Sequence, residues 1–504
     1  MLHSPRTAPV VVAALLVACG QGAPAPVLAP PPIPSDVARR PASPPPPPDP
    51  LGGRPEVSDP GLFAPKPPVS YRRPNGMDVW LIERHELPIV AVHVVVPYGS
   101  SGDPKGKEGL AYITAGMLDE GAGSRGALEL ARAIDLLGAT LRTGAYTDHS
   151  VVSLTALKKT LSPALAILGD VVVRPRFLPA EFRRVHDLWT NDLAQKTKDP
   201  GAVAQATELR VVFGEDHPYG HPVDGTARGA ARIALADVTG FHGSRWRPDA
   251  ATCVVVGDVT RDEVDRELDA ALGAWAAPKT PAPPQPEIPA PNEPEAGRVV
   301  LVDRPDAPQA VVSLARPGVA ASAPDAAALV RVNTALGGSF TSRLNQDLRE
   351  DKGWTYGAKS RFSFTRGVGI FSAGAAVFTD KTGEAARALV GHVEKMAKEG
   401  LTDDEVQKTR LLARADLVET FEAVDATAAR LARNAGVGLP LDHEITSAAI
   451  RDSVTRVSLG ALAAKYVGKG AVLVVVGPRA VVEPQLRKAG FGAVTVVDAE
   501  GVKR

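Results

Sequence analysis

Two kinds of hydrophobic pattern alternate along the chain after its first 68 residues. Short runs dominated by valine, leucine and isoleucine predict buried β-strands, because such side chains fit a pleated surface that is covered by other elements. These runs occupy residues 79–82, 89–96, 252–257, 299–302, 310–314 and 472–477. Longer segments in which apolar residues recur every three or four positions predict helices. They cover residues 128–137, 181–196, 384–398 and 404–434.

The predicted elements form two series with the same order. Each series begins with strands, continues with helices and ends with a strand that reaches a glycine, Gly257 or Gly477, before a further helix. A proline-rich linker, residues 278–297, separates the two series. A repeat of about 200 residues indicates two copies of one domain rather than a solenoid. We therefore expect an α+β fold with one α/β layer in each copy, at residues 69–277 and 298–504.

The N-terminus has the pattern of an export signal. Arg6 precedes an apolar run, residues 10–18, that is too short to span a bilayer but has the length of a secretory signal. The run ends in Leu-Val-Ala-Cys-Gly at residues 16–20, which resembles the lipobox of bacterial lipoproteins. This resemblance implies a lipoprotein signal over residues 1–19, a lipidated Cys19 and a lipid-anchored location in the cell envelope, in the outer membrane facing the periplasm. A simple cleaved signal peptide is the alternative.

The segment that follows the signal, residues 20–68, is crowded with proline and includes five prolines in a row at residues 44–48. Such a segment cannot form a packed core and is typical of a disordered, extended tether. We therefore expect the folded body to work at a distance from the membrane to which Cys19 would anchor it.

Composition narrows the possible functions. Hydrophobic residues make up 44% of the chain and charged residues 23%, which is ordinary for a soluble globular protein. The formal net charge is zero and no basic run occurs, so the sequence offers no argument for a nucleic-acid partner. With only two cysteines, Cys19 and Cys253, neither a disulfide framework nor a thiolate zinc site is expected. Cys253 lies in a valine-rich run and is expected to be a core residue.

Four separate stretches carry a resemblance to one enzyme family. They are residues 75–76 with 99–104 and 108–111, residues 130–139, the segment His-Pro-Tyr-Gly-His-Pro at 217–222 with Gly225, and residues 340–350 running on to 352–356. In this order across both halves, they resemble the pitrilysin/insulinase-type zinc peptidases and, within them, the processing-peptidase-like branch. The resemblance covers about residues 70–495 and implies a duplicated peptidase fold.

The helix that holds zinc in this family lacks its ligands here. The family motif H-x-x-E-H puts two histidines on one helix face to bind Zn²⁺, and its glutamate activates water. Tyr112, Ala115 and Gly116 occupy these three positions. The family's third ligand position corresponds to Asp192, for which an ordinary surface carboxylate is the alternative. The resemblance therefore implies no metal cofactor in this chain, with zinc expected only in a partner chain.

The second half keeps another part of the family's site. Arg349 and Tyr356 have the spacing of the family's Arg and Tyr that complete the cleft from the opposite domain. The resemblance implies that Arg349 grips a peptide with its planar guanidinium and that Tyr356 donates to the oxyanion. A surface charge and a packed aromatic residue are the alternatives. Gly337 and Gly338 weakly resemble the family's glycine-rich substrate-binding loop, with an ordinary turn as the alternative.

The histidines outside this motif offer weaker signals. His217 and His221 form H-x-x-x-H, but the prolines at residues 218 and 222 make a continuous helix improbable, so we do not expect a metal site there. His149 beside Asp148, and His186, are expected to be structural.

Three functions remain open on this basis. The leading hypothesis is a non-catalytic subunit of a heteromeric metallopeptidase, which lends peptide binding and oxyanion stabilisation to a zinc-bearing homologous partner. The alternative is a stand-alone peptide-binding or scaffold lipoprotein of the cell envelope. The second alternative is an active zinc peptidase with a relocated site. The partners expected are that homologous subunit, a peptide and, through the lipid anchor, a membrane.

Overall fold

The computed structural model describes residues 61–498 except 292–294, 296 and 469. The predictions for the signal at residues 1–19, for Cys19 and for most of the tether at residues 20–68 therefore lie outside the described residues. No helix in the described part combines the length and the apolar character that a membrane crossing requires.

The first half is built on a six-stranded sheet with the order β1-β2-β6-β3-β5-β4. Its strands are β1 (Val69–Arg72), β2 (Asp78–Glu83), β3 (Ile89–Val96), β4 (Thr140–Ala145), β5 (Ser150–Leu157) and β6 (Thr252–Gly257). Helices cover one face of the sheet and enclose the main core. They are α1 (Leu110–Gly116), α2 (Ala127–Leu136), α3 (Leu161–Val173), α4 (Pro179–Lys196), α7 (Leu235–Arg245) and α8 (Arg261–Leu272), and the short α6 (Ala227–Ala230) lies beside α4.

The second half repeats this layer with a sheet of order β12-β7-β11-β8-β10-β9. Its strands are β7 (Val299–Asp303), β8 (Ala310–Pro317), β9 (Ala358–Ser363), β10 (Ile370–Val377), β11 (Val472–Gly477) and β12 (Val494–Val497). The helices of its core are α9 (Ala326–Asn333), α10 (Arg343–Asn345), α11 (Thr382–Glu399), α15 (Arg456–Tyr466) and α16 (Arg479–Lys488). Helices α12 (Asp403–Glu422) and α14 (His443–Ser453) pack beside α9.

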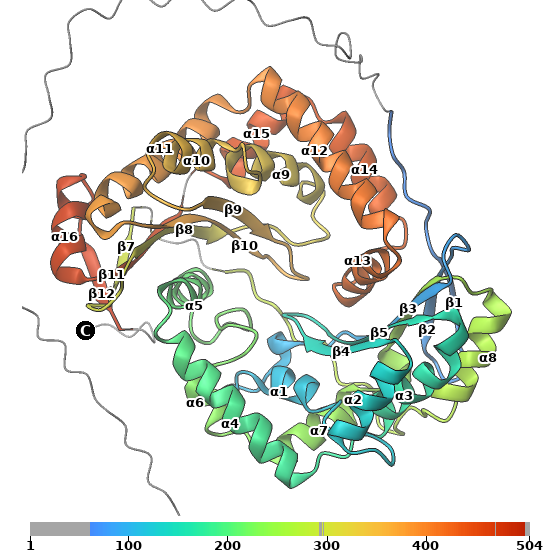
Figure 1. The fold of residues 1–504 in the computed structure, drawn as a ribbon. Helices are drawn as coiled ribbons and strands as arrows, with labels where there is room; N and C mark the ends of the chain where they lie inside the picture. The colour runs from blue at the N-terminus through green and yellow to red at the C-terminus, as the bar shows by residue number, and fades with distance from the viewer. Residues whose placement is uncertain (1–60, 292–294, 296, 469, 499–504) are drawn as a thin grey trace, which may run out of the picture. The chain divides into compact units, whose positions relative to one another are not determined.

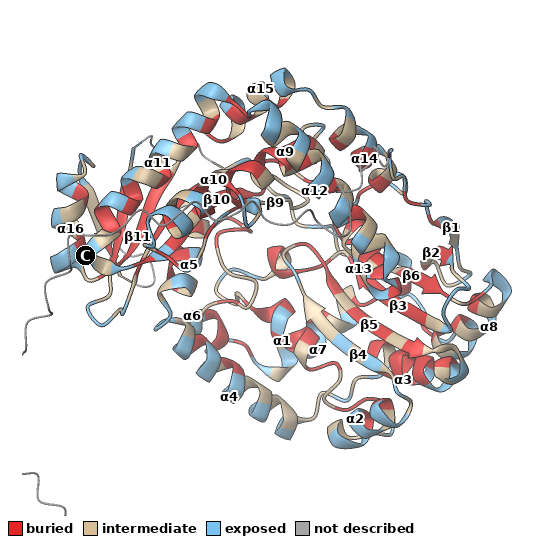
Figure 2. Ribbon diagram, turned by 45° about the horizontal axis from the view of Figure 1, so that its top comes forward, coloured by how far each residue is buried: buried red, intermediate tan, exposed pale blue. Residues whose placement is uncertain are grey.

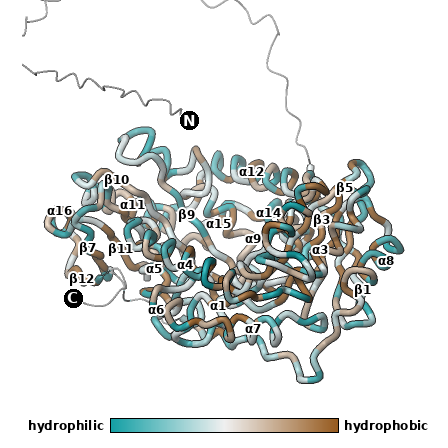
Figure 3. The backbone as a smooth tube through the Cα atoms, turned by 60° about the horizontal axis from the view of Figure 1, so that its bottom comes forward, coloured by the Kyte–Doolittle hydropathy of each residue, from teal (hydrophilic) through white to brown (hydrophobic). Residues whose placement is uncertain are grey.

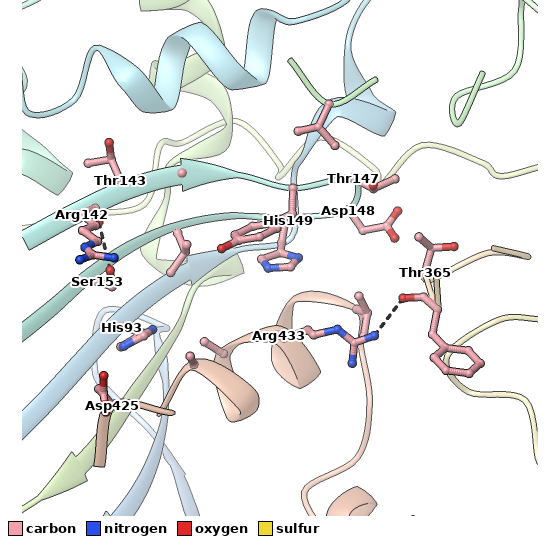
Figure 4. Close-up of a pocket in the computed structure, with 18 of the residues that line it drawn as sticks. His93, Arg142, Thr143, Thr147, Asp148, His149, Ser153, Thr365, Asp425 and Arg433 are labelled. Carbon is pink, nitrogen blue, oxygen red and sulfur yellow. Dashed lines mark hydrogen bonds between the residues drawn. The ribbon is translucent and has the colours of Figure 1, made fainter. Parts of the chain in front are cut away.

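The two sheets share the order of five strands and their register, but the sixth strand differs, because β1 is antiparallel to β2 whereas β12 is parallel to β7. His93 on β3 lies opposite Val254, and Ser313 on β8 lies opposite Val474. Val254 and Val474 each stand three residues before the glycine that ends their strand, so His93 and Ser313 occupy equivalent places. The valine-rich strands are buried, as Figure 2 shows in red, and the run along β3 is strongly apolar in Figure 3. The predicted duplicated α+β fold is confirmed.

Each half covers the open face of the other half's sheet with one helix. Helix α13 (Val424–Gly436) belongs to the second half by sequence, but packs on β3 and β6 of the first. Helix α5 (Pro200–Phe213) belongs to the first half, but packs on β8 and β11 of the second. Both contacts are apolar, with Leu431 among the residues of one and Val203 among those of the other. Each fully buried side chain of this size contributes about 1.5–3 kcal/mol, so the exchange holds the halves together.

The single helix predicted over residues 404–434 is wrong, because the chain breaks at Ala423. This residue has extended backbone angles, φ −88° and ψ 135°, and separates α12 from α13. The break lets the apolar side of α13, including Val424 and Leu431, reach the first sheet instead of continuing along the second half. Long-range burial outweighs the local helical pattern here, since alanine itself favours a continuous helix.

Candidate functional site

Helices α1 and α4 and strand β4 enclose a pocket of about 320 Å³ in the first half. Tyr112, Gly116 and Asp192, which the sequence resemblance predicts to correspond to the family's metal ligands, all line it. The start of α1 is held firmly, because the Asp103 carboxylate accepts hydrogen bonds from the backbone N–H groups of Gly109 (2.7 Å) and Ala111 (2.8 Å). Burial raises the pKa of Asp103 to about 8, although these two hydrogen bonds oppose the shift. The local geometry therefore keeps the three positions together.

A glycine is required at residue 109, directly before helix α1. It has a φ of 103°, and a Cβ there would lie 2.5 Å from the Trp189 ring. Trp189 in turn donates from its indole nitrogen to the carbonyl oxygen of Asp224 at 2.9 Å. The chain thus approaches α4 so closely at the start of α1 that there is no room for a side chain between residue 109 and Trp189.

The pocket contains little that can bind zinc. Tyr112 is 38% exposed and its ring centroid lies 6.2 Å from that of Trp189. Gly116 has no side chain, and Ala115, at the position of the family's catalytic glutamate, is buried. The Asp192 carboxylate is engaged by Lys196 at 2.7 Å, and the same ammonium group contacts Asp224 at 2.6 Å. Three protein ligands are the usual minimum for zinc, so these residues do not fit the metal.

No group of three or more His, Cys, Asp and Glu residues in the described ranges is arranged to hold a metal ion. His217 lies in the loop between α5 and α6, where its Nδ1 accepts from the backbone N–H of Tyr219 (2.9 Å). Its Nε2 therefore carries the proton and donates to the carbonyl oxygen of Pro289 (3.0 Å). Nδ1 of His221 lies 2.9 Å from the carbonyl oxygen of Pro222, and Nε2 of His186 lies 2.9 Å from that of Ala230. These contacts give the histidines structural roles.

Arg349 and Tyr356 lie on the surface of the second half. Arg349 belongs to a π-helical segment, Gln346–Asp351, and Tyr356 to the loop before β9. Tyr356 is 83% exposed, and the Arg349 guanidinium carbon lies 4.8 Å from the centroid of the exposed Phe340 ring. Arg349 also contacts Glu350 at 3.3 Å. The alternative raised for Tyr356, a strand residue packed on the core, does not describe this placement.

The backbone ties the loop of Tyr356 to the segment of Arg349. The N–H of Gly353 donates to the carbonyl oxygen of Arg349 (3.0 Å), and the N–H of Trp354 donates to that of Leu348 (2.9 Å). Asn345 adds a side-chain bridge, because its amide donates to the carbonyl oxygen of Phe340 (2.6 Å) and accepts from the N–H of Ala358 (3.3 Å). The arginine and the tyrosine are therefore presented on one compact unit.

The two glycines proposed for substrate binding have packing constraints. Gly337 is buried at the end of the π-helical segment Thr334–Gly338, and a Cβ there would lie 2.3 Å from the backbone nitrogen of Ser360 on β9. At Gly338 a Cβ would lie 2.6 Å from the side chain of Asn333. The close approach of β9 thus explains Gly337, while substrate binding by either glycine stays a prediction.

A second, larger cavity of about 850 Å³ lies over the open face of the first sheet, next to α13. Arg142 on β4, Ser153 on β5 and His93 on β3 lie in one row across its floor, paired strand to strand. Asp425 and Arg433 of α13 also line it. Sequence reasoning missed this group, because isolated polar residues in three strands gain meaning only when the strands pair. Their single signal is polarity within otherwise apolar runs.

The two histidines of this cavity are buried. Burial lowers the pKa of His93 to about 4, with Asp425 opposing the shift. Burial also lowers the pKa of His149 to about 4, and the positive charge of Arg433 adds to this effect. His149 stacks on Tyr146, with ring centroids 4.7 Å apart, and faces Gly436 at the end of α13. Both rings are therefore neutral near pH 7.

A buried aspartate fastens the two halves at the rim of the cavity. Asp148, in the turn between β4 and β5, accepts hydrogen bonds from the Tyr219 hydroxyl (2.8 Å) and the backbone N–H of Arg366 (2.8 Å). The Tyr219 oxygen accepts in turn from the N–H of Gly367 (2.9 Å). Arg366 and Gly367 belong to the hairpin loop between β9 and β10. Asp148, the neighbour of His149, thus links the two halves.

Comparison with known proteins places these features in a family. Residues 78–208 match the family described as Insulinase (Peptidase family M16), and residues 232–412 match the Peptidase M16 inactive domain. An uncharacterized zinc protease of Mycobacterium leprae is 27% identical over 414 residues, which are 81% of this chain and 91% of that protein. A non-peptidase homolog of Helicobacter pylori is 25% identical over 330 residues, 65% of this chain and 74% of the homolog.

Two solved structures show the same fold. A peptidase M16 inactive domain from Pseudomonas fluorescens superimposes with a TM-score of 0.75 at 27% identity, covering 82% of this chain and 98% of that one. A chain in complex III of Candida albicans gives a TM-score of 0.68 at 12% identity, covering 84% and 99%, a likeness of fold alone. Sequence matches in both halves and the shared fold agree that this chain belongs to the insulinase, or M16, peptidase family.

Proposed function

We propose that this chain is the zinc-less subunit of a two-chain M16 peptidase of the processing-peptidase-like type. In this proposal it lends Arg349 and Tyr356 to the cleft of a zinc-bearing homologous partner. The observation that carries the proposal is the contrast between a metal pocket whose only carboxylate is engaged by Lys196 and a Tyr356 side chain that is 83% exposed. A hydroxyl so exposed is free to meet a reacting group held by another chain.

The chemistry divides between the two chains. Peptide hydrolysis needs a metal-activated water, which the partner supplies, and donors for the oxyanion that forms at the scissile carbonyl. The Tyr356 hydroxyl is the donor on this chain, and the Arg349 guanidinium grips the peptide through its planar fork. The family likeness to a chain of complex III supports a multi-chain setting, since that protein occurs within an assembly.

The edge strand β4 offers a place for the peptide itself. It is the last strand of the first sheet, and its Thr143 and Gly144 line both the α1 pocket and the larger cavity. An extended peptide can add to such an edge through main-chain hydrogen bonds. We therefore expect the bound peptide to run along β4.

Reconstitution tests the proposal. The chain is mixed with the nearest homologous protein that carries an intact H-x-x-E-H motif, and peptide cleavage is compared for each chain alone and for the mixture. We expect activity only in the mixture, and no stoichiometric zinc in this chain by elemental analysis. A partner that is fully active alone and unaffected by this chain would instead favour the stand-alone peptide-binding or scaffold function.

The scaffold alternative has support of its own. The homolog of Helicobacter pylori that resembles this chain is named a non-peptidase. Arg349 is also partly engaged, by Glu350 and by Phe340, which suits a surface contact as well as a catalytic one. The third possibility, a relocated zinc site, finds no set of ligands among the described residues.

We also propose that Cys19 is acylated and anchors the chain in the cell envelope, in the outer membrane facing the periplasm. The support is the lipobox-like sequence at residues 16–20 and the proline-rich tether after it. Cys19→Ser should release the protein from the membrane fraction or leave an unprocessed precursor. A wild-type chain that takes up no labelled fatty acid would contradict the anchor.

A further inference from the structure

The second half shows how a carboxylate can be seated on the open face of this kind of sheet. Glu208 of α5 is buried over the second sheet, where its carboxylate accepts a hydrogen bond from the Ser313 hydroxyl. Arg361 of the edge strand β9 approaches the same carboxylate at 3.9 Å and donates to Ser372 on the neighbouring strand β10. This carboxylate site thus consists of Arg361 on the edge strand β9, Ser372 on β10 and Ser313 on β8. Strand β8 is the equivalent of β3 in the first half.

The first half has the same kinds of residue at the corresponding strands. Arg142 on the edge strand β4 lies directly opposite Ser153 on β5, as Arg361 lies opposite Ser372. His93 on β3 occupies the place of Ser313, as the register shows. The arginine–serine pair is displaced by two residues along its strands, which keeps it on the same face of the sheet.

In the first half, Asp425 of α13 acts on His93, but no carboxylate of the described residues makes an ion pair with Arg142. Helix α13 covers β3 and β6 but leaves β4 and β5 open to the cavity of about 850 Å³. Arg142 makes no ion pair with any residue between 61 and 498 that the structure describes. Arg433 donates to the carbonyl oxygen of Phe364 (3.0 Å) and likewise has no carboxylate within ion-pairing distance in the described part.

His93 also lines this space, where the carboxylate of Asp425 opposes the lowering of its pKa by burial. Its side chain is only 7% exposed, and among the described residues its ring makes no hydrogen bond. A ligand with oxygen acceptors can take a hydrogen bond from this ring. A neutral imidazole retains one N–H for this purpose.

The charges around the cavity favour an anion. Arg142 and Arg433 bring two positive charges, and Asp148 is neutralised by Arg366 at 3.9 Å and by three hydrogen-bond donors. Asp425 is exposed at the rim, at the first turn of α13, and is the only other carboxylate that lines the cavity. The four charged residues of the lining sum to zero, but Asp148 is paired with Arg366, which lies outside the lining. The lining charges that make no ion pair among the described residues are therefore two arginines and one aspartate.

We propose that this cavity is a binding site for a carboxylate of an acidic peptide, held by Arg142 with Ser153, His93 and Arg433. This proposal adds to the proposed function that the bound peptides are acidic. It rests on the proposed function in one respect, that the ligand is a peptide. The carboxylate is supplied either by a glutamate or aspartate side chain or by the free C-terminus of the peptide. In both cases the bidentate fork of Arg142 matches the two carboxylate oxygens.

Direct binding to the full chain tests this site. The probe is a fluorescently labelled peptide of alternating glutamate and alanine, measured by anisotropy at low and high salt beside its glutamine and lysine counterparts. We expect the glutamate peptide to bind most tightly, and more weakly as salt rises. Arg142→Gln should weaken it by about tenfold or more, as expected for the loss of a charged hydrogen-bonded pair.

Matched variants separate the site from general effects. Arg132→Gln changes an exposed arginine of α2 that does not line the cavity, and should leave affinity unchanged. Arg142→Lys keeps the charge without the fork and should lose less than Arg142→Gln. An amidated C-terminus that abolishes binding, where glutamine substitution does not, would assign the carboxylate to the peptide terminus. Equal affinity for all three peptides that also survives amidation of the C-terminus, or no effect of Arg142→Gln, would overturn the proposal.

This assay is independent of catalysis. Tyr356→Phe should leave acidic-peptide binding intact, since Tyr356 does not line the cavity. Loss of activation in the reconstituted mixture with intact binding would therefore refute the subunit role alone, and loss of acidic preference with intact activation would refute the carboxylate site alone.

Discussion

In the first half, α1 and α4 enclose a pocket at the family's metal position, yet its ligand positions are Tyr112, Gly116 and an Asp192 held by Lys196. In the second half, Arg349 and Tyr356, which the sequence resemblance predicts to be the family's Arg and Tyr, lie on the surface. The first region is a pocket that lacks zinc-binding side chains. The second region presents an arginine and a tyrosine, but they lie on the surface rather than in a pocket. This difference is the arrangement that the proposed division of labour between two chains requires, because this chain would supply Arg349 and Tyr356 and the partner the metal.

The largest effect should come from removing the one group that acts only in the transition state. In the reconstituted mixture, Tyr356→Phe should lower kcat by about 10²–10³-fold, the usual loss for an oxyanion donor. Tyr112→Phe is the matched control, because it removes a tyrosine hydroxyl from the first-half pocket, and should leave kcat unchanged. Steady-state kinetics with one peptide decides between them. Equal losses in both variants would mean that the pocket at α1 still takes part in catalysis.

A smaller effect is expected from Arg349→Ala. Its guanidinium contacts the peptide in the ground state and in the transition state, so the substitution should raise KM by about 10–100-fold with little change in kcat. Arg183→Ala alters an exposed arginine of α4 and serves as the control. A drop in kcat at constant KM would contradict this prediction and would indicate that Arg349 stabilises the transition state rather than binding the peptide.

The frame could be predicted from the sequence far better than the cavity. The valine-rich runs at residues 89–96, 252–257 and 472–477 coincide with β3, β6 and β11, because such strands are buried on both faces and leave an unbroken apolar signal. The spacing of the family motif also brought Tyr112, Gly116 and Asp192 to one pocket. Short-range sequence patterns are sufficient to predict single strands and helices. They also predict a site when its residues keep the spacing of a family motif.

What the sequence did not reveal depends on contacts between distant segments. The break at Ala423 has no local signal, since its cause is the burial of Leu431 on a sheet more than a hundred residues away in the chain. Arg142, Ser153 and His93 likewise come together only through strand pairing. The exchanged helices α5 and α13 are therefore the part of the fold that sequence periodicity cannot supply.

The two exchanged-helix interfaces should respond to pH in opposite directions. At the first, the pKa of His149 falls from 6.5 to about 4 in the folded state, so its contribution to stability is present above pH 6.5 and is lost as the pH falls toward 4. From these two values, His149 lowers the free energy of unfolding by about 2 kcal/mol between pH 7 and pH 5. At the second, burial raises the pKa of Glu208, so its contribution falls as the pH rises.

Urea unfolding at pH 7 and pH 5 measures this effect. His149→Gln should flatten the loss of stability on acidification. His85→Gln removes an exposed histidine whose pKa is raised by Asp258, so this control should not flatten the loss of stability on acidification. If the slope of His149→Gln equals that of the wild type, the acid sensitivity resides elsewhere than in the contact with α13.

The smallest effect tests the enclosure of the first-half pocket itself. Gly116 ends α1 with helical backbone angles, and a Cβ at this residue would meet no atom within 4 Å. Gly116→Ala should therefore raise the free energy of unfolding by about 0.5–1 kcal/mol, the usual gain from replacing a helical glycine. Thermal or urea unfolding of the two proteins provides the measurement.

Gly337→Ala is the matched change in the second half, and it should have the opposite sign. Its Cβ would lie 2.3 Å from the backbone nitrogen of Ser360, so β9 must shift, at a cost of about 1–3 kcal/mol. If both substitutions destabilise, the space at Gly116 is filled by the moving side chains of the pocket. If Gly116→Ala stabilises, the pocket keeps room for a histidine at this ligand position, and what the first half lacks is the ligands rather than the space for them.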